Sequence, residues 1–230
     1  MNAGHEPARG RNHSAVADEG GRLVVVSGPG GDLGQWRALV ATLGSVLGAA
    51  VAVEATTAEP RGARWVDALL EQAARAPGPV LVLPPPAEPP EPAEGEPAEH
   101  PVRALRHALA PFDTTPEVSD AVGPVLRALQ EHGIRITQLH VPTAETVPAM
   151  WEGAGHHAHA WQLELRRRHG VGTASVEVTS GPPALAVAAR SAQADLVVLC
   201  WKRRWDDGRA AVVRGVLAST GIPVLLLPES

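Results

Sequence analysis

The stretch that decides the fold is DLVVLC, residues 195–200, together with IPVLLL, residues 222–227. Both runs are short and continuously apolar, which is typical of strands buried on both faces of a parallel sheet. A helical pattern over 212–217 separates them. Upstream, the same alternation predicts strands over 107–112, 134–141 and 175–178 and helices over 118–129 and 183–192. This alternation indicates an α/β fold, a flavodoxin- or Rossmann-like parallel sheet with helices on both faces.

The N-terminal half repeats this alternation in a shorter form. Its patterns predict strands over 22–27, 50–54 and 79–83 and helices over 36–47 and 65–76. The half ends in PVLVLP, residues 79–84, much as the C-terminal half ends in PVLLLP, residues 223–228. This weak internal repeat favours tandem units of which the first has lost elements.

A proline- and glutamate-rich segment separates the two halves. Because it holds no large apolar side chain, it predicts an extended, self-repelling spacer. The first residues of the chain are polar and lack the apolar run of a signal peptide, so we expect a disordered tail there. The predicted organisation is a tail over 1–21, a reduced unit over 22–83, a linker over 84–101 and a complete α/β domain over 102–230.

The composition of the 230-residue chain excludes several classes of protein. Apolar residues make up 44% and charged residues 20%, as in an ordinary globular protein, and no uncharged apolar run is long enough to span a bilayer. A net charge of −5 does not favour nucleic-acid binding. The single cysteine, Cys200, excludes an intrachain disulfide and fits a reducing cytoplasm. Lys202 is the only lysine, and there are six tryptophans but one phenylalanine and no tyrosine.

The C-terminal half resembles the universal stress protein family over most of its length. Five segments match the family's motifs in the family's order: LAPFDT (109–114), LHV (139–141), SGPPA (180–184), ADLVVL (194–199) and IPVLL (222–226). The resemblance implies the same flavodoxin-like sheet, with a degenerate copy of it in the first half. Members often dimerise through their last strand, so residues 79–83 and 222–227 are candidates for pairing, within one chain or between two chains.

The family's ATP-binding motif is not matched here. Many members bind ATP through Gly-x2-Gly-x9-Gly-(Ser/Thr) after the fourth strand, where glycines let backbone N–H groups approach phosphate. In this chain Cys200 and Arg203 occupy the first two glycine positions, and the third glycine and its Ser/Thr fall near Ala210 and Ala211. We therefore expect no ATP bound in the family's way, and no other cofactor.

Ligands of an open parallel sheet bind beyond the carboxyl ends of its strands. Two residues expected there, Asp113 and Val141, match adenine-side positions of the family. The full predicted ligand-binding set is Asp113, Thr114, His140, Val141, Cys200, Trp201, Lys202, Arg203, Arg204 and Trp205.

Three adjacent cations, Lys202, Arg203 and Arg204, stand out in this acidic protein. The guanidinium fork and the lysine point charge suit phosphate, sulfate or carboxylate, so the cluster predicts a site for a small anionic ligand. The alternative is a solvated loop whose cations balance Asp206 and Asp207.

A histidine cluster, His156, His157 and His159, is the second candidate site. Two of the three share a helix face, but a zinc site needs further ligands, so no metal is predicted. One of these histidines is a candidate for acid–base catalysis, and the alternative is a polar helix or loop that carries surface histidines. Lys202 is a further catalytic candidate, through its charge. Cys200 is either a nucleophile activated by neighbouring cations or a buried core residue.

Three functions stay open at this point. The first is a universal-stress-protein-like ligand-binding or regulatory protein that has lost the ATP motif. The second is an enzyme subunit in a biosynthetic pathway, which binds an anionic substrate through Lys202, Arg203 and Arg204 and assists elimination or transfer of its anionic group. The third is a structural partner that uses its tryptophan surface. We expect a small anionic ligand and a homodimeric or heteromeric protein partner, with no nucleic acid and no membrane.

Overall fold

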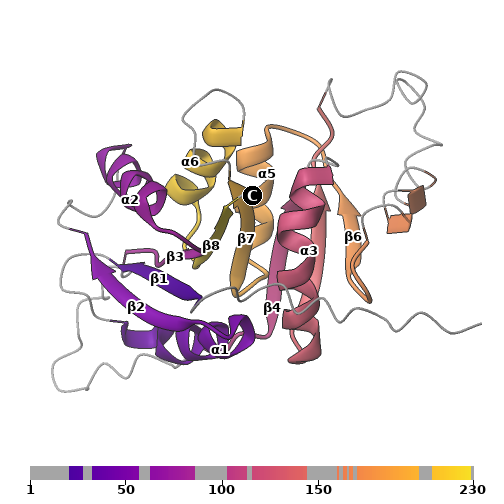
Figure 1. Ribbon diagram of the computed structural model, residues 1–230. Coiled ribbons are helices and arrows are strands. Elements are labelled where there is room, and N and C mark those ends of the chain that lie inside the picture. Colours follow the sequence, from indigo (N-terminus) through magenta and orange to yellow (C-terminus); the bar gives the residue numbers. More distant parts are fainter. Residues whose placement is uncertain are drawn as a thin grey trace, which may run out of the picture.

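In the computed structural model, the described residues form one eight-stranded sheet with helices on both faces (Figure 1). The structure describes residues 21–27, 33–56, 63–85, 103–112, 116–143, 160, 163–164, 166–167, 170–201 and 209–228. The strands are β1 (Arg22–Ser27), β2 (Ala50–Ala55), β3 (Val80–Val82), β4 (His107–Phe112), β5 (Arg135–His140), β6 (Ser175–Val178), β7 (Leu196–Trp201) and β8 (Val224–Pro228). The predicted α/β fold is confirmed.

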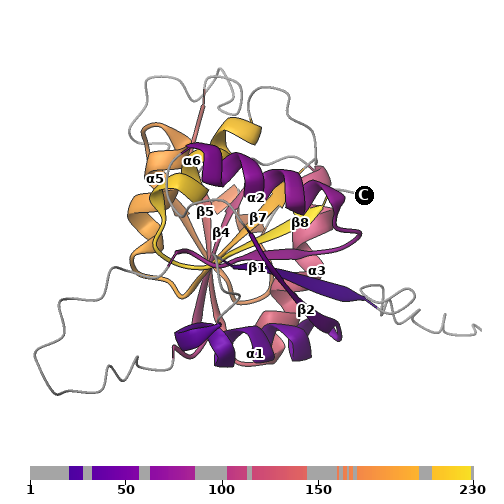
Figure 2. The same ribbon diagram turned by 90° about the vertical axis from the view of Figure 1, so that its left-hand side faces the viewer.

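The helices divide between the two faces of the sheet (Figure 2). They are η1 (Gly34–Trp36), α1 (Arg37–Leu47), α2 (Ala63–Arg75), α3 (Pro116–Glu131), α5 (Pro183–Ser191) and α6 (Arg209–Ser219). Helices α1 and α3 pack on one face, and α2, α5 and α6 pack on the other. None of the helices described is long and apolar enough to cross a bilayer.

The strand order is β2-β1-β3-β8-β7-β4-β5-β6. Every neighbouring pair is parallel except β3 and β8, which are antiparallel, with Leu81 opposite Leu225 at the centre of the pairing. The closing strands of the two halves therefore pair within one chain, which is one of the two arrangements that the sequence leaves open. Because β3 and β8 run in opposite directions, the carboxyl ends of β1–β3 and those of β4–β8 lie at opposite edges of the sheet.

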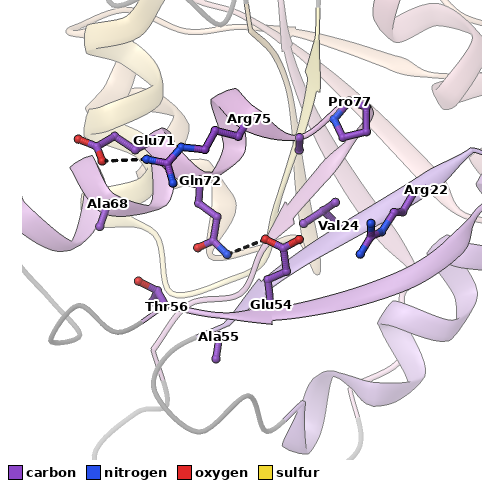
Figure 3. A pocket seen from close by; sticks show the side chains of 11 residues that line it. Arg22, Val24, Glu54, Ala55, Thr56, Ala68, Glu71, Gln72, Arg75 and Pro77 are labelled. Atoms are coloured by element: carbon purple, nitrogen blue, oxygen red, sulfur yellow. Dashed lines mark hydrogen bonds and ion pairs between the residues drawn. The ribbon is translucent and has the colours of Figure 1, made fainter.

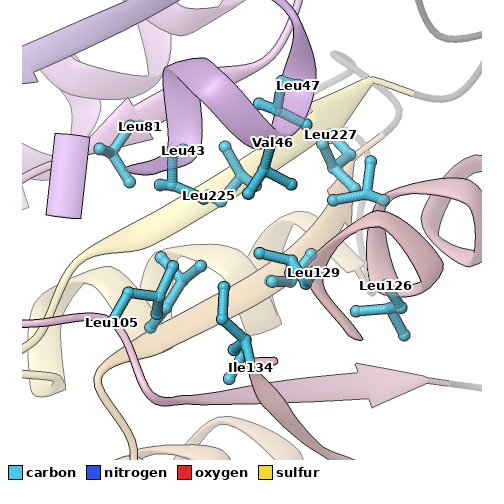
Figure 4. Close-up of a cluster of buried hydrophobic side chains, with 14 of the residues drawn as sticks. Leu43, Val46, Leu47, Leu81, Leu105, Leu126, Leu129, Ile134, Leu225 and Leu227 are labelled. Atoms are coloured by element: carbon cyan, nitrogen blue, oxygen red, sulfur yellow. The ribbon is translucent and has the colours of Figure 1, made fainter. Parts of the chain in front are cut away.

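The core on the α1/α3 face draws its side chains from both halves of the chain. Leu43 of α1, Leu81 of β3, Leu225 of β8 and Leu129 of α3 belong to one buried cluster (Figure 4). All four side chains are completely buried. Each such leucine contributes about 1.5–3 kcal/mol by leaving water, so the two halves share the apolar burial that stabilises them.

The aspartate of the ADLVV segment connects the starts of two strands. The Asp195 carboxylate accepts hydrogen bonds from the backbone N–H groups of Arg106 and His107, both at 2.9 Å. The Asp195 N–H in turn donates to the His107 carbonyl at 2.8 Å. The side chain therefore aligns the beginning of β4 with the beginning of β7, which is a structural role and not a contact with a ligand.

The predicted tail and spacer lie largely outside the described residues, which exclude 1–20 and 86–102. The boundaries proposed for the tail, the reduced unit, the linker and the complete domain therefore stay predictions. The structure shows that the strands on either side of the spacer belong to the same sheet.

Replacing Asp195 tests its role. We expect Asp195→Ala to lower the free energy of unfolding by about 1–3 kcal/mol, because two backbone donors lose a charged acceptor. Asp195→Asn keeps a side-chain oxygen at the same place and should cost clearly less. Urea denaturation of both variants measures the difference, and equal losses would contradict the assigned hydrogen bonds.

Candidate functional site

The strands β4, β5 and β7 end side by side at one edge of the sheet. β4 pairs with β5 on one side and with β7 on the other, both in parallel. After β4 the chain adds strands on one side of it, through β5 and β6, and then crosses to the other side for β7 and β8. Such a reversal is where open α/β sheets bind ligands. The described residues at this edge are Phe112, His140, Val141, Cys200 and Trp201.

His140 connects three strand ends and is completely buried. Its Nδ1–H donates to the Phe112 carbonyl at 3.2 Å, and the two rings lie 5.4 Å apart between centroids. The His140 carbonyl accepts from the N–H of Thr179, just after β6, at 3.0 Å. His140 is predicted as a ligand-binding residue; the structure shows its side chain buried at the end of β5, where its hydrogen bonds join β4, β5 and the residue after β6.

Cys200 and Trp201 are both buried, on opposite faces of β7. Cys200 belongs to the core cluster on the α1/α3 face and Trp201 to the cluster on the α2/α5/α6 face. The apolar run predicts a strand that ends at Cys200, which is wrong by one residue: β7 continues through Trp201, level with Pro228 of β8. A thiolate nucleophile needs access to its substrate, so the burial of Cys200 favours the packing interpretation.

Val141 follows β5 directly and is also buried, in the cluster on the α2/α5/α6 face. The side chain thus packs at the strand end where the family resemblance places an adenine-side residue. The other predicted site residues lie outside the described part of the chain and stay predictions; they are Asp113, Thr114, His156, His157, His159, Lys202, Arg203, Arg204 and Trp205.

A groove that the sequence did not reveal lies in the N-terminal half, between α2 and β2 (Figure 3). It has a volume of about 490 Å³ and is lined by both charged and small apolar residues. Within it the Glu54 carboxylate accepts a 2.8 Å hydrogen bond from the side-chain amide of Gln72. These two residues lie on a strand and a helix 18 positions apart, so no local sequence pattern predicts their meeting.

Replacing His140 tests its role in joining the strand ends. We expect His140→Ala to lower the free energy of unfolding by about 2–5 kcal/mol, because it leaves a cavity and removes a hydrogen bond between two strands. The matched control is His132→Ala at the exposed end of α3, which should cost less than about 1 kcal/mol. Urea unfolding measures both, and a loss at His140 no larger than at His132 would contradict the assignment.

No protein-family model matches the chain, and no curated protein matches it. Solved structures similar to it include a universal stress protein from Archaeoglobus fulgidus, at 13% identity and TM-score 0.46, over 71% of this chain and 54% of that one. The chain thus spans about half the length of that protein. Another is a putative universal stress protein from Pseudomonas aeruginosa, at 15% identity and TM-score 0.43, over 90% of this chain and 93% of that one. A third is UspA from Lactobacillus plantarum, at 19% identity and TM-score 0.40, over 54% and 97% respectively. These solved structures carry the name of the family whose motifs the C-terminal half resembles.

Proposed function

We propose that this chain is a ligand-binding protein of the universal stress protein type that holds a small anion where β4, β5 and β7 end. The observation that carries the proposal is the pairing of β4 with β7, in which Ala108 lies opposite Leu196. In this register the last residues of the two strands, Phe112 of β4 and Trp201 of β7, end neighbouring strands of the sheet. Lys202 is the first residue after β7.

The chemistry of the adjoining residues supports an anionic ligand. Lys202, Arg203 and Arg204 follow β7 without interruption, and each supplies a positive charge. Charge-assisted hydrogen bonds from such groups to phosphate, sulfate or carboxylate oxygens are about twice as strong as neutral ones. The side chains of His140 and Trp201, at the ends of β5 and β7, are buried, and exclusion of water strengthens the attraction between charges.

The loss of the family's ATP motif is part of the proposal. A phosphate-binding glycine loop needs backbone N–H groups that are free to face the ligand. At the first motif position, Cys200 is part of the β7–β8 ladder, opposite Leu227, and its side chain is packed in the core. An anion at this edge would therefore be held by cationic side chains and not by a glycine loop.

Calorimetric titration of the full chain tests the proposal. The probes are inorganic phosphate, sulfate, AMP and Mg-ATP, with cAMP and dAMP added because universal stress protein structures in complex with them are known. We expect a phosphate-bearing probe to bind and Lys202→Ala or Arg203→Ala to weaken it at least tenfold, the loss of one charge-assisted hydrogen bond.

The matched control is Arg135→Ala, which removes an exposed cation at the opposite end of β5 and should leave binding unchanged. Equal affinity in the Lys202, Arg203 and Arg135 variants would contradict the proposal. Tight Mg-ATP binding that Asp113→Ala abolishes and Lys202→Ala leaves intact would show instead that nucleotide binds in the family's way.

A further inference from the structure

β2 is an edge strand of the sheet that the described residues form. Within the described part of the chain it pairs only with β1. Its side chains Val51 and Val53 are 40% and 43% exposed, although valine is usually buried. The sheet's other edge strand, β6, is shorter, and its Glu177 forms an ion pair with Arg190 of α5. β2 is therefore the more accessible of the two edges.

The backbone of β2 is ready to accept another strand. The N–H groups of Ala50 and Thr56 donate to carbonyls at the two ends of β1, at 2.8 and 3.0 Å. Because residues of a strand alternate in direction, the N–H and C=O groups of Val51 and Val53 point away from the sheet. β2 also contains no proline and no lysine, the residues that commonly prevent such an edge from pairing.

The groove on the α2 side of β2 contains charged side chains of which only some form ion pairs (Figure 3). Glu71 and Arg75 of α2 form an ion pair at 3.7 Å, and Glu54 accepts its hydrogen bond from the neutral Gln72. The exposed guanidinium of Arg22, at the start of β1, has no ion pair with any residue that the structure describes. Each chain thus offers one cation and one carboxylate without an oppositely charged partner in the groove.

We propose that β2 forms the interface of a symmetric dimer, in which the β2 strands of two copies pair antiparallel about a two-fold axis at Ala52. In this register Val51 of each copy lies opposite Val53 of the other. The two valine pairs each exchange two backbone hydrogen bonds, and their side chains cover one another on the α1 side. A two-fold axis closes the assembly, whereas pairing of β2 with β6 would continue without end.

The same register brings the unmatched charges together. Glu54 of one copy lies opposite Ala50 of the other, and Arg22 is the neighbour of that Ala50 on β1. Two strand spacings, about 10 Å between Cα atoms, then separate Glu54 from Arg22 of the other copy, which the two extended side chains span. Both side chains lie on the groove side of the sheet. The dimer contains this contact twice.

Sedimentation velocity of the full chain, from about 1 to 100 µM, tests the proposal. We expect a dimer, which Val53→Lys converts to a monomer because it places a lysine at the centre of the apolar pairs. The control Leu185→Lys changes a side chain of α5 that is 61% exposed and should leave the dimer intact. α5 contacts β4, and four strands separate β4 from β2 in the sheet. A wild-type chain that stays monomeric at 100 µM overturns the proposal, as does a dimer that Val53→Lys does not affect.

A charge exchange tests the register independently of any effect of Val53→Lys on folding. Arg22→Glu and Glu54→Arg should each weaken the dimer about tenfold or more, because like charges then meet. The double variant restores opposite charges across the axis and should regain most of the affinity. Thermal unfolding confirms that each variant is folded, and failure of the folded double variant to recover would rule out the Ala52 register.

Discussion

The antiparallel pairing of β3 with β8 joins two sets of parallel strands into one sheet, and the rest of the structure depends on it. The paired residues are buried, and the cores on both faces continue across the junction. Each closing strand would otherwise be an exposed apolar edge, which invites association. Pairing within the chain satisfies both strands at once and makes the folding of one half dependent on the other.

The β3–β8 junction lies between the two regions for which functions are proposed, the anion site and the dimer interface. The proposed anion site lies where the carboxyl ends of β4, β5 and β7 meet. There β4 has β5 on one side and β7 on the other, and cations follow β7 in the sequence. The proposed dimer interface is the edge strand β2, the first strand in the strand order, on the other side of the β3–β8 junction. The proposed anion site and the proposed dimer interface therefore lie in different parts of the sheet and can be altered separately.

Much of the fold could be predicted from the sequence because buried parallel strands are short and continuously apolar. The runs over 107–112 and 175–178 coincide with β4 and β6. The predicted strand over 195–200 stops one residue short because Trp201 borders a charged run, yet Trp201 is the last residue of β7 and packs on one face of the sheet. The choice between pairing within or between chains could not be predicted, since both satisfy the same exposed strands.

The candidate site was predictable only in its position on the fold. Asp113 and Lys202 follow strands that the sequence predicts, and open parallel sheets bind ligands beyond the carboxyl ends of their strands. The burial of His140 at the strand ends and the hydrogen bonds of the Asp195 carboxylate could not be predicted, because each depends on backbone groups distant in sequence. The same holds for the contact of Glu54 with Gln72, which needs α2 to be seated beside β2.

Hydrogen exchange measured by mass spectrometry on the full chain tests the central claim most directly. If β3 and β8 form one ladder within the chain, their amides should exchange together, only through global unfolding, and at a rate independent of protein concentration. Rapid exchange of Val80–Val82 while β8 stays protected, or protection of both strands that is lost on dilution, would contradict the account.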